Sequence, residues 1–408
     1  MERLPPLTAQ SVTLARRALE QPLCDYCLGR LFSAEGDATA DADRGRLLRS
    51  SAGGPPTPPS GCALCEGLLG EADALCDAVV GALEGYEYTT FLVGSTVARD
   101  LLEREASLAK ALGLTPPRTL KQAVNREVGL RVYARVHREV DFDDPDIVAK
   151  VDTRFNTATL QVKSLYVRGR YRKVARGIPQ TRWPCTHCRG RGCARCGNTG
   201  QMYALTVEGA VAGPLIEMVG GDGHALHGAG REDIDARMLG RGRPFVVEIR
   251  SPRRRAFDPA ALAQAVRDRS AGLVEVEGLA ACDKAVVAAL KAANWSKTYR
   301  VLVGLEKAIK VDQIDRACAE LSGSYVDQQT PLRVAHRRSD KIRRRRVEKV
   351  QLLRADGEEI ELEVTGESGL YVKELMNGDE GRTQPSLAGI LGMACDVREL
   401  DVTEIHDG

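Results

Sequence analysis

Eight of the twelve cysteines fall into four Cys-x-x-Cys pairs, and this spacing constrains the fold of the 408-residue chain more than any other feature. The pairs form two groups of four, and each group supplies the tetrahedral sulfur set that structural Zn²⁺ prefers. A closed set of four cysteines leaves no coordination position for water, which favours a structural metal over a catalytic one. The sequence therefore predicts structural Zn²⁺ at one or two sites, with these ligands: Cys24, Cys27, Cys62, Cys65, Cys185, Cys188, Cys193 and Cys196.

The same cysteines bear on the cellular compartment. No stretch approaches about 18 uninterrupted apolar residues, and "MERLPPLTAQ" at the N-terminus lacks the basic and apolar regions of a secretory signal. We therefore expect a cytoplasmic protein, where disulfides are disfavoured and metal ligation explains paired cysteines best. Redox chemistry is the weaker alternative, because neither cluster follows a strand as in thioredoxin-like proteins.

The length indicates two or three domains, and 43% apolar with 28% charged residues is typical of a globular protein. We expect an N-terminal Cys₄ segment over 1–70, an α/β region with the second Cys₄ cluster over 71–204, and a final domain over 205–408. Apolar spacing of three and four residues predicts helices over 74–85 and 96–113. β-branched alternation predicts the following strands: 129–142, 146–152 and 159–174.

Beyond residue 205, short strands alternate with helices. Strands are predicted over 243–252, 272–279 and 297–305, and helices over 260–270, 283–293 and 313–323. Residues 347–366 alternate on both sides of Asp356-Gly357, which predicts a β-hairpin. The second half therefore indicates an α+β domain with a largely antiparallel sheet.

Two basic runs indicate a nucleic-acid partner. Residues 166–196 hold nine lysines and arginines and no acid, with aromatic residues between them, and residues 333–349 form a second basic run. Uniform positive charge with interleaved aromatics suits a phosphate backbone and unpaired bases, although a solvated surface is the alternative. RNA is favoured over DNA because the sequence shows no helix-turn-helix and no finger with histidine ligands. The candidate RNA-binding residues are Arg168, Arg170, Arg172, Lys173, Arg337 and Arg338.

The stretch "GAGREDIDARMLGRGRPF" over 228–245 places carboxylates beside arginines on a segment that its glycines predict to be a bent loop. A solvated turn explains such a stretch as well, if it is taken alone. With RNA as substrate, Asp233 becomes a candidate nucleophile, because nearby cations favour the ionised form of a carboxylate. No serine–histidine or cysteine–histidine pattern competes with it.

These segments together resemble the archaeal type of the Pus10 branch of the tRNA pseudouridine synthases. The resemblance lies in "HGAGREDIDARMLGRGRPFVVEI", "SKTYRVLV", "QQTPLRVAHRR" and "ESGLYVKELMNGDEGRTQPSLAGIL", and also in "GRYRKVARGIPQTRWPCTHC" and "CDYCLGRLF". They cover nearly the full length in colinear order. The resemblance implies Asp233 as the catalytic aspartate, with Asp235 as its rival, and Lys373 as the basic residue that pairs with the catalytic carboxylate.

The resemblance also implies a substrate pocket. Tyr299 is similar to a tyrosine that stacks on the target uracil, and Tyr371 to one that lines the uridine pocket. Ordinary packing is the alternative for both tyrosines. Arg231, in the segment that resembles Gly-Arg-x-Asp, is expected to contact the substrate.

The implied fold is α+β, with an N-terminal zinc-knuckle and THUMP-like RNA-binding domain before a pseudouridine synthase domain built on a central, mostly antiparallel sheet. The implied reaction isomerises uridines 54 and 55 in the TΨC arm of tRNA and needs no catalytic cofactor. We expect tRNA as the partner, and neither a membrane nor an obligate protein partner.

Two other classes compete with this hypothesis. A THUMP-bearing methyltransferase or thiolation enzyme requires a glycine-rich donor site after a strand, and none is visible. A zinc-knuckle protein that binds RNA without catalysis is the second alternative, which loss of activity with retained binding in Asp233→Asn would distinguish.

Overall fold

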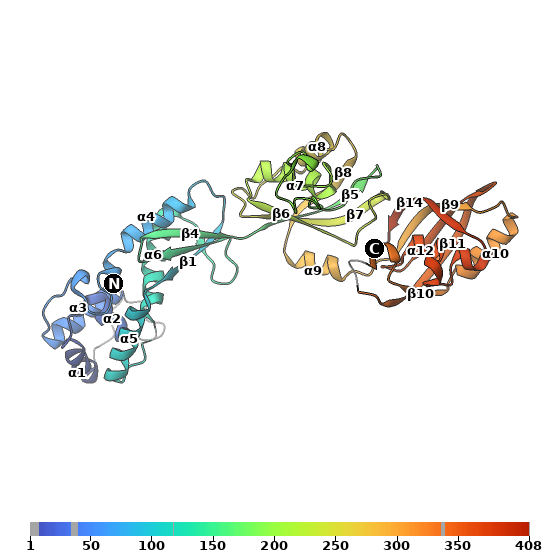
Figure 1. Cartoon of the computed structure of the whole chain (residues 1–408). Helices are drawn as coiled ribbons and strands as arrows, with labels where there is room; N and C mark the ends of the chain where they lie inside the picture. The colour runs from blue at the N-terminus through green and yellow to red at the C-terminus, as the bar shows by residue number, and fades with distance from the viewer. Residues whose placement is uncertain (1–7, 34–39, 117, 336–338, 408) are drawn as a thin grey trace. The chain divides into compact units, whose positions relative to one another are not determined.

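The computed structural model describes residues 8–33, 40–116, 118–335 and 339–407. Contacts divide the chain into two units (Figure 1). The first unit holds residues 1–163 with 253–255, and the second holds 164–252 with 256–408. Each unit has its own hydrophobic core, so each is described by itself.

The first unit packs helices around a small mixed sheet. Its sheet has the order β2-β1-β3-β4, in which β1 runs parallel to β2 and β3 while β4 is antiparallel to β3. The predicted helices over 74–85 and 96–113 correspond to α4 and α5, and the predicted strand over 146–152 corresponds to β3. The elements are α1 (Ala9–Ala18), α2 (Asp25–Leu31), α3 (Asp41–Ala52), η1 (Pro59–Gly61), η2 (Leu68–Gly70), α4 (Ala72–Leu83), β1 (Thr90–Thr96), α5 (Arg99–Leu112), α6 (Leu120–Val136), β2 (Glu139–Val140), β3 (Ile147–Asp152) and β4 (Thr157–Val162).

The predicted strand over 129–142 is wrong, because most of this segment belongs to helix α6. A capping box at Thr119 and Gln122 begins the helix. The buried residues Leu120, Val124 and Val128 recur every four positions, which is the spacing of a helix face. The β-branched valines favour a strand, but the four-residue spacing of the buried residues favours a helix, and the structure has the helix. Among the described residues, no helix combines the length and the apolar character that a membrane crossing requires.

The second unit is built on a ten-stranded sheet of order β13-β10-β11-β12-β9-β14-β7-β5-β8, with β6 beside β7. The β14–β7 pairing is parallel and the other pairings in this sheet are antiparallel, so the predicted sheet type is confirmed. The strands are β5 (Leu165–Lys173), β6 (Gly223–Gly228), β7 (Arg237–Arg250), β8 (Val274–Cys282), β9 (Lys297–Leu305), β10 (Tyr325–Gln329), β11 (Ile342–Asp356), β12 (Glu359–Gly366), β13 (Thr383–Gln384) and β14 (Cys395–Ile405).

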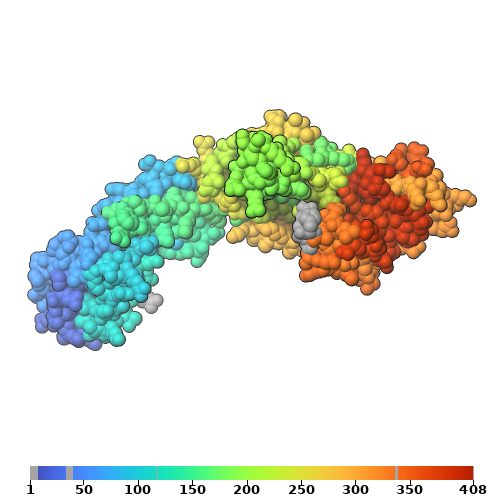
Figure 2. Space-filling view, in the orientation of Figure 1, coloured from blue at the N-terminus to red at the C-terminus, as the bar shows by residue number. Residues whose placement is uncertain are grey.

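Helices cover this sheet in two groups. The helix α7 packs against α8, while α10 and α12 pack against β11 and β14 respectively. The space-filling view shows the orange and red residues from β9 onward as one contiguous surface (Figure 2). The helices are η3 (Ala194–Cys196), α7 (Val207–Val219), α8 (Pro259–Arg269), α9 (Ala285–Ala292), α10 (Val311–Leu321), α11 (Leu332–Ala335), α12 (Val372–Asn377), η4 (Asp379–Gly381) and α13 (Leu387–Leu391).

The hairpin predicted over 347–366 is confirmed. Strands β11 and β12 are joined at Asp356 and Glu359, and Gly357 between them has φ +60°. A positive φ at this position is inexpensive for glycine, which is why the Asp-Gly pair marks a tight turn.

The predicted domain limits at residues 70 and 204 differ from the observed division. Strand β5 pairs with β7 and β8, so residues 164–204 belong to the second unit together with the second cysteine cluster. In the first unit, Leu28 and Leu48 share one core with Val128, so residues 1–70 do not form a core of their own.

The helical assignment of α6 predicts different effects for two leucines on it. Leu120→Ala removes a fully buried side chain, so we expect the free energy of unfolding of the first unit to fall by about 2–5 kcal/mol. Leu130, which is 52% exposed, is the control, and Leu130→Ala should change it by less than about 0.5 kcal/mol. Denaturant unfolding measures both variants, and equal losses would contradict the helix register.

Candidate active site and metal centres

The loop over 229–236 joins β6 to β7 in the second unit. The bent loop predicted over 228–245 is confirmed only in this part, because residues 237–245 belong to strand β7. The two strands are antiparallel, with Gly228 opposite Phe245, so the loop leaves and re-enters the sheet at one end. Gly230 has φ +78°, a conformation that favours glycine. The loop is therefore a turn over the end of the sheet rather than a continuation of either strand.

Glu232 anchors this loop to strands β5 and β7 of the sheet. Its side chain is 1% exposed, and its carboxylate lies 3.0 Å from Arg243 Nε and accepts a hydrogen bond from the Tyr171 hydroxyl at 2.8 Å. Burial and the neighbouring Glu232 charge raise the pKa of Tyr171 well above its usual value, so this tyrosine remains a hydrogen-bond donor. Because the buried Glu232 carboxylate is bound by both Arg243 and Tyr171, its position in the loop is fixed.

Two further cationic contacts fix the loop backbone. Arg243 Nη1 donates to Ala229 O at 2.6 Å. Lys173 Nζ donates to Asp233 O at 3.2 Å and to Ile234 O at 3.3 Å. Both cations bind backbone oxygens of the loop, and the Asp233 carboxylate is left to contact other groups.

Asp233 lies beside two cations. Arg333 Nη1 is 3.0 Å from its carboxylate, and Lys373 Nζ is 3.8 Å from it. Lys373 is closer to Asp235, at 2.6 Å, so it bridges both aspartates instead of pairing with Asp233 alone. Burial opposes the ionisation of Asp235, but the hydrogen bond and the charge of Lys373 outweigh it and lower the pKa of Asp235.

Arg333 is the functional candidate that the sequence analysis missed. It lies on the short helix α11, and Glu374 of α12 holds its Nε at 2.6 Å while Nη1 reaches Asp233. The Glu374 side chain is 4% exposed, and its charge raises the pKa of Arg333 despite burial. One hundred residues separate Arg333 from Asp233, so only its place in "TPLRVAHRR" could have marked it.

A cavity of about 440 Å³ lies over the loop and is lined by Asp233 together with both predicted tyrosines. This volume falls within the range of about 300–1,000 Å³ that is usual for small-ligand sites. Tyr299 projects from β9, where burial raises its pKa to about 12, and Tyr371 precedes the first turn of α12. Arg231 also lines the cavity, so the structure brings together the predicted substrate-binding residues.

Lys297 is a further cation of this cavity. Its Nζ donates to Trp295 O at 2.9 Å and to Ser368 Oγ at 3.3 Å. Burial, and to a lesser extent the Arg243 charge, lower the pKa of Lys297 to about 8. Its ammonium is therefore held by neutral oxygens rather than by a carboxylate.

The predicted RNA-binding residues of β5 differ in how exposed they are and in what they contact. Arg168 is exposed, whereas Arg170 donates to Arg241 O at 2.7 Å and pairs with Asp407. Arg172 lies 2.9 Å from Glu275. Both partly buried arginines therefore have partners within the unit.

Lys173 was predicted to bind RNA, and this prediction is wrong because its side chain is fully buried against the loop over 229–236. Alternation along β5 places Lys173 on the same face as the buried residues Val167 and Tyr171. Arg337 and Arg338 lie outside the described residues.

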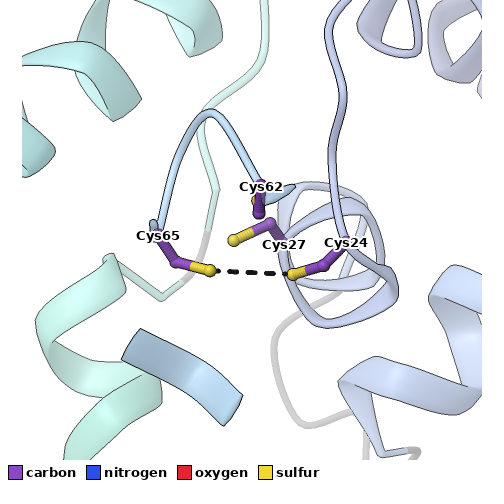
Figure 3. A group of neighbouring side chains, drawn as sticks. All are labelled: Cys24, Cys27, Cys62 and Cys65. Atoms are coloured by element: carbon purple, nitrogen blue, oxygen red, sulfur yellow. Dashed lines mark hydrogen bonds between the residues drawn. The ribbon is translucent and has the colours of Figure 1, made fainter. Parts of the chain in front are cut away.

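Cys24, Cys27, Cys62 and Cys65 converge in the first unit, and their sulfur atoms all lie within 4.8 Å of one another (Figure 3). The Cys24 and Cys65 sulfurs are 3.8 Å apart. A tetrahedral site with Zn–S bonds of about 2.3 Å has sulfur–sulfur edges of about 3.8 Å. These four cysteines therefore fit a metal ion of that size.

Cys185, Cys188, Cys193 and Cys196 form the second cluster, also with all sulfurs within 4.8 Å. The Cys188–Cys196 and Cys193–Cys196 sulfur distances are 3.9 and 3.7 Å. The turn between Cys188 and Cys193 depends on glycine: Gly192 has φ +90°, and a Cβ there would lie 2.9 Å from the Asn198 backbone oxygen. Both groups of four could hold a metal ion, as the cysteine spacing predicted.

Comparison with known proteins agrees with this arrangement. The family profile described as "Pus10, C-terminal" matches residues 166–406, and that described as "Pus10 THUMP domain, archaeal" matches residues 75–152. The chain is 39% identical to the tRNA pseudouridine synthase Pus10 of Methanothrix thermoacetophila, over 94% of this chain and 92% of that protein. It is also 39% identical to the protein of that name from Halorubrum lacusprofundi, over 96% and 95% of the two chains.

Among solved structures, the chain is similar to a Cbf5-Nop10-Gar1 complex at 22% identity, with a TM-score of 0.30 over 48% of this chain and 44% of that one. That similarity is too distant to assign any residue. The sequence relatives and the family profiles place the chain among the pseudouridine synthases, which are RNA-modifying isomerases. Within that class, it belongs to the Pus10 family of tRNA pseudouridine synthases.

The Glu232 anchor predicts a large stability effect for a small change. Glu232→Gln leaves the buried Arg243 charge without its carboxylate, so we expect the free energy of unfolding of the second unit to fall by about 3–5 kcal/mol. Asp235→Asn, three residues along the same loop, removes a carboxylate whose side chain is 61% exposed and should cost less than about 1 kcal/mol. Thermal and denaturant unfolding compare the two, and a stable Glu232→Gln variant would contradict the anchoring role.

Proposed function

We propose that this chain isomerises uridines 54 and 55 in the TΨC arm of tRNA to pseudouridine, with Asp233 as the catalytic carboxylate. Family membership and the name of its relatives support tRNA as the substrate. The observation that carries the residue assignment is the position of Asp233 in a cavity with Tyr299 and Tyr371, beside the cations of Arg333 and Lys373.

The neighbouring acids suit the catalytic role less well. Glu232 also lines the cavity, but its side chain is 1% exposed and its oxygens are occupied by Arg243 and Tyr171. Asp235 has a more exposed side chain, 61% against 35% for Asp233, and is not part of the cavity lining. Asp233 is therefore the acid that an entering base can reach while the loop stays in place.

In the proposed reaction, the target uridine leaves its stack at a cost of a few kcal/mol and enters the cavity. Tyr299 supports the base, since base–aromatic stacking contributes about 1–3 kcal/mol. Two cations stabilise the negative charge of Asp233 as it promotes cleavage of the N1–C1′ bond. The uracil then rotates, C5 bonds to C1′, the C5 proton leaves and N1 takes up a proton.

The reaction breaks one bond to C1′ and forms another, so it requires neither a redox partner nor a group donor. Asp233 acts on the N1–C1′ bond, and the tyrosines position the base. The positive charges of Arg333 and Lys373 stabilise the Asp233 carboxylate. The two cysteine clusters would hold Zn²⁺, whose tetrathiolate coordination closes the metal shell and stabilises the surrounding turns.

Replacing the catalytic carboxylate tests the assignment. Asp233→Asn should lower the rate of pseudouridine formation at least about 10³-fold, because the neutral amide cannot act as a nucleophile. Its Kd for an unmodified tRNA transcript should remain within about twofold of wild type. Carbodiimide primer extension maps the product, and filter binding gives the Kd.

Asp235→Asn is the matched control for that experiment and should retain activity within about tenfold. Full activity in Asp233→Asn, or loss of activity only in Asp235→Asn, would overturn the choice of Asp233. Modification at uridines other than 54 and 55 would overturn the substrate positions and leave the catalytic residue standing.

Zinc quantitation tests the metal proposal. Protein purified without chelator should contain about two zinc ions per chain, and Cys24→Ser and Cys185→Ser should each lower this by about one. Cys282→Ser is the control, since Cys282 belongs to neither cluster, and should leave the zinc content unchanged. Atomic absorption gives the ratio, and a value near zero in the wild type would reject zinc.

A further inference from the structure

We propose that Arg343 and Arg345 bind the RNA phosphates next to the nucleotide that enters the cavity, an inference that rests on the proposed function. Both residues line the cavity and are partly buried. They belong to the first half of β11, within a run of four arginines over 343–346. The argument depends on which face of the strand each arginine occupies.

Strand pairing divides the arginine run into two faces. Directly opposed residues of antiparallel strands share a face, and Arg343 and Arg345 oppose Gln328 and Val326, which are both fully buried. Arg344 instead opposes Asp327 and is exposed. The odd-numbered arginines therefore project toward the cavity, while the even-numbered ones project from the opposite face.

The charges of the two cavity-facing arginines are not neutralised by any residue in the described parts of the chain. Among the described residues, no carboxylate oxygen lies within 4 Å of either guanidinium. Arg343 Nη1 instead donates to Thr330 Oγ1 at 2.9 Å, and Arg345 Nη1 donates to a backbone oxygen at 2.9 Å. By contrast, Arg243 and Arg333 of the same cavity are each paired with a carboxylate.

Arg345 also carries a donor that is not used. Its Nε is buried and has no hydrogen-bond partner in the described structure. A buried donor without an acceptor costs about 1–3 kcal/mol, and the cost is larger for charged groups. A hydrogen-bond acceptor that enters the cavity and binds Arg345 Nε would remove this cost. The protein without RNA therefore presents an unused donor to such a group.

The motif before α12 makes room for this guanidinium. Gly369 has φ +86°, and a Cβ at this position would lie 3.2 Å from Arg345 Nε and 3.5 Å from its Nη2. The glycine therefore places Arg345 against the segment that leads into Tyr371, which is on the wall of the proposed uridine pocket. Arg345 therefore lies against a glycine that is only two residues before Tyr371 in the chain.

A phosphodiester is the acceptor that fits these features. A nucleotide that leaves its stack brings its flanking phosphates to the rim of the site, and the two planar guanidiniums can each bind a phosphate through paired N–H donors. Such contacts would offset part of the cost of extruding the base. If RNA binding depended only on the overall positive charge of β11, the arginines of its outer face would contribute equally, which makes Arg344 and Arg346 the matched control.

The experiment compares two double variants of one strand. Arg343→Gln/Arg345→Gln removes the cavity-facing charges, and Arg344→Gln/Arg346→Gln removes the same charge from the outer face. For an unmodified tRNA transcript, we expect the first pair to raise KM at least about tenfold and to reduce the slope of log Kd against log salt by about 1.5, at roughly 0.7–0.9 per phosphate contact. The outer pair should stay within about twofold in KM.

A modified substrate separates phosphate binding from a structural role. In a TΨC stem–loop with one neutral methylphosphonate beside the target uridine, wild type and the outer-face variant should lose affinity, whereas the cavity-face variant should lose no more than about twofold further. Equal losses in both double variants, or full additivity with the methylphosphonate, would overturn the inference. Wild-type enzyme that makes no pseudouridine would reject the proposed function instead, and normal tRNA kinetics in the cavity-face variant would reject only the role of these two arginines.

Discussion

The buried ion pair between Glu232 and Arg243 is the interaction on which the geometry of the candidate site depends. Both side chains are 1% exposed, so the pair carries a desolvation cost that its Coulomb attraction only partly offsets. Its contribution is geometric: Arg243 also binds Ala229 O, and Lys173 binds the carbonyls of Asp233 and Ile234. The loop is therefore held both at the Glu232 carboxylate and at its backbone oxygens. Because the loop is fixed, the side chain of the next residue, Asp233, stays in the cavity.

Positive charge in the second unit therefore serves two different purposes. Lys173 and Arg243 are buried and support the loop, whereas Arg333 and Lys373 contact the carboxylates of the aspartates. The Glu374 carboxylate holds Arg333 so that one edge of its guanidinium remains for Asp233. This division explains why a count of basic residues indicates an RNA partner but does not say which cations reach it.

The sequence predicted features that depend on short spacing and missed those that depend on tertiary contacts. The two Cys₄ clusters and the hairpin at Gly357 follow from local rules, and the structure contains them. The bent loop predicted over 228–245 is shorter than expected and ends where β7 begins at Arg237. The β-branched residues of α6 favour a strand, whereas its four-residue apolar spacing and its capping box favour the helix that the structure contains. The role of Arg333 could not be predicted, since it arises from a contact between positions one hundred residues apart.

The order of strands in the large sheet has a consequence for synthesis of the enzyme. Strand β14, which follows every other described strand in the sequence, lies between β9 and β7 and joins the two parts of the sheet. Asp233 comes from one part, while Tyr299 and Lys373 come from the other. Until residues 395–405 have been translated, no strand connects the two parts of the sheet, so the cavity that holds Asp233 and Tyr299 can form only after β14 has been made.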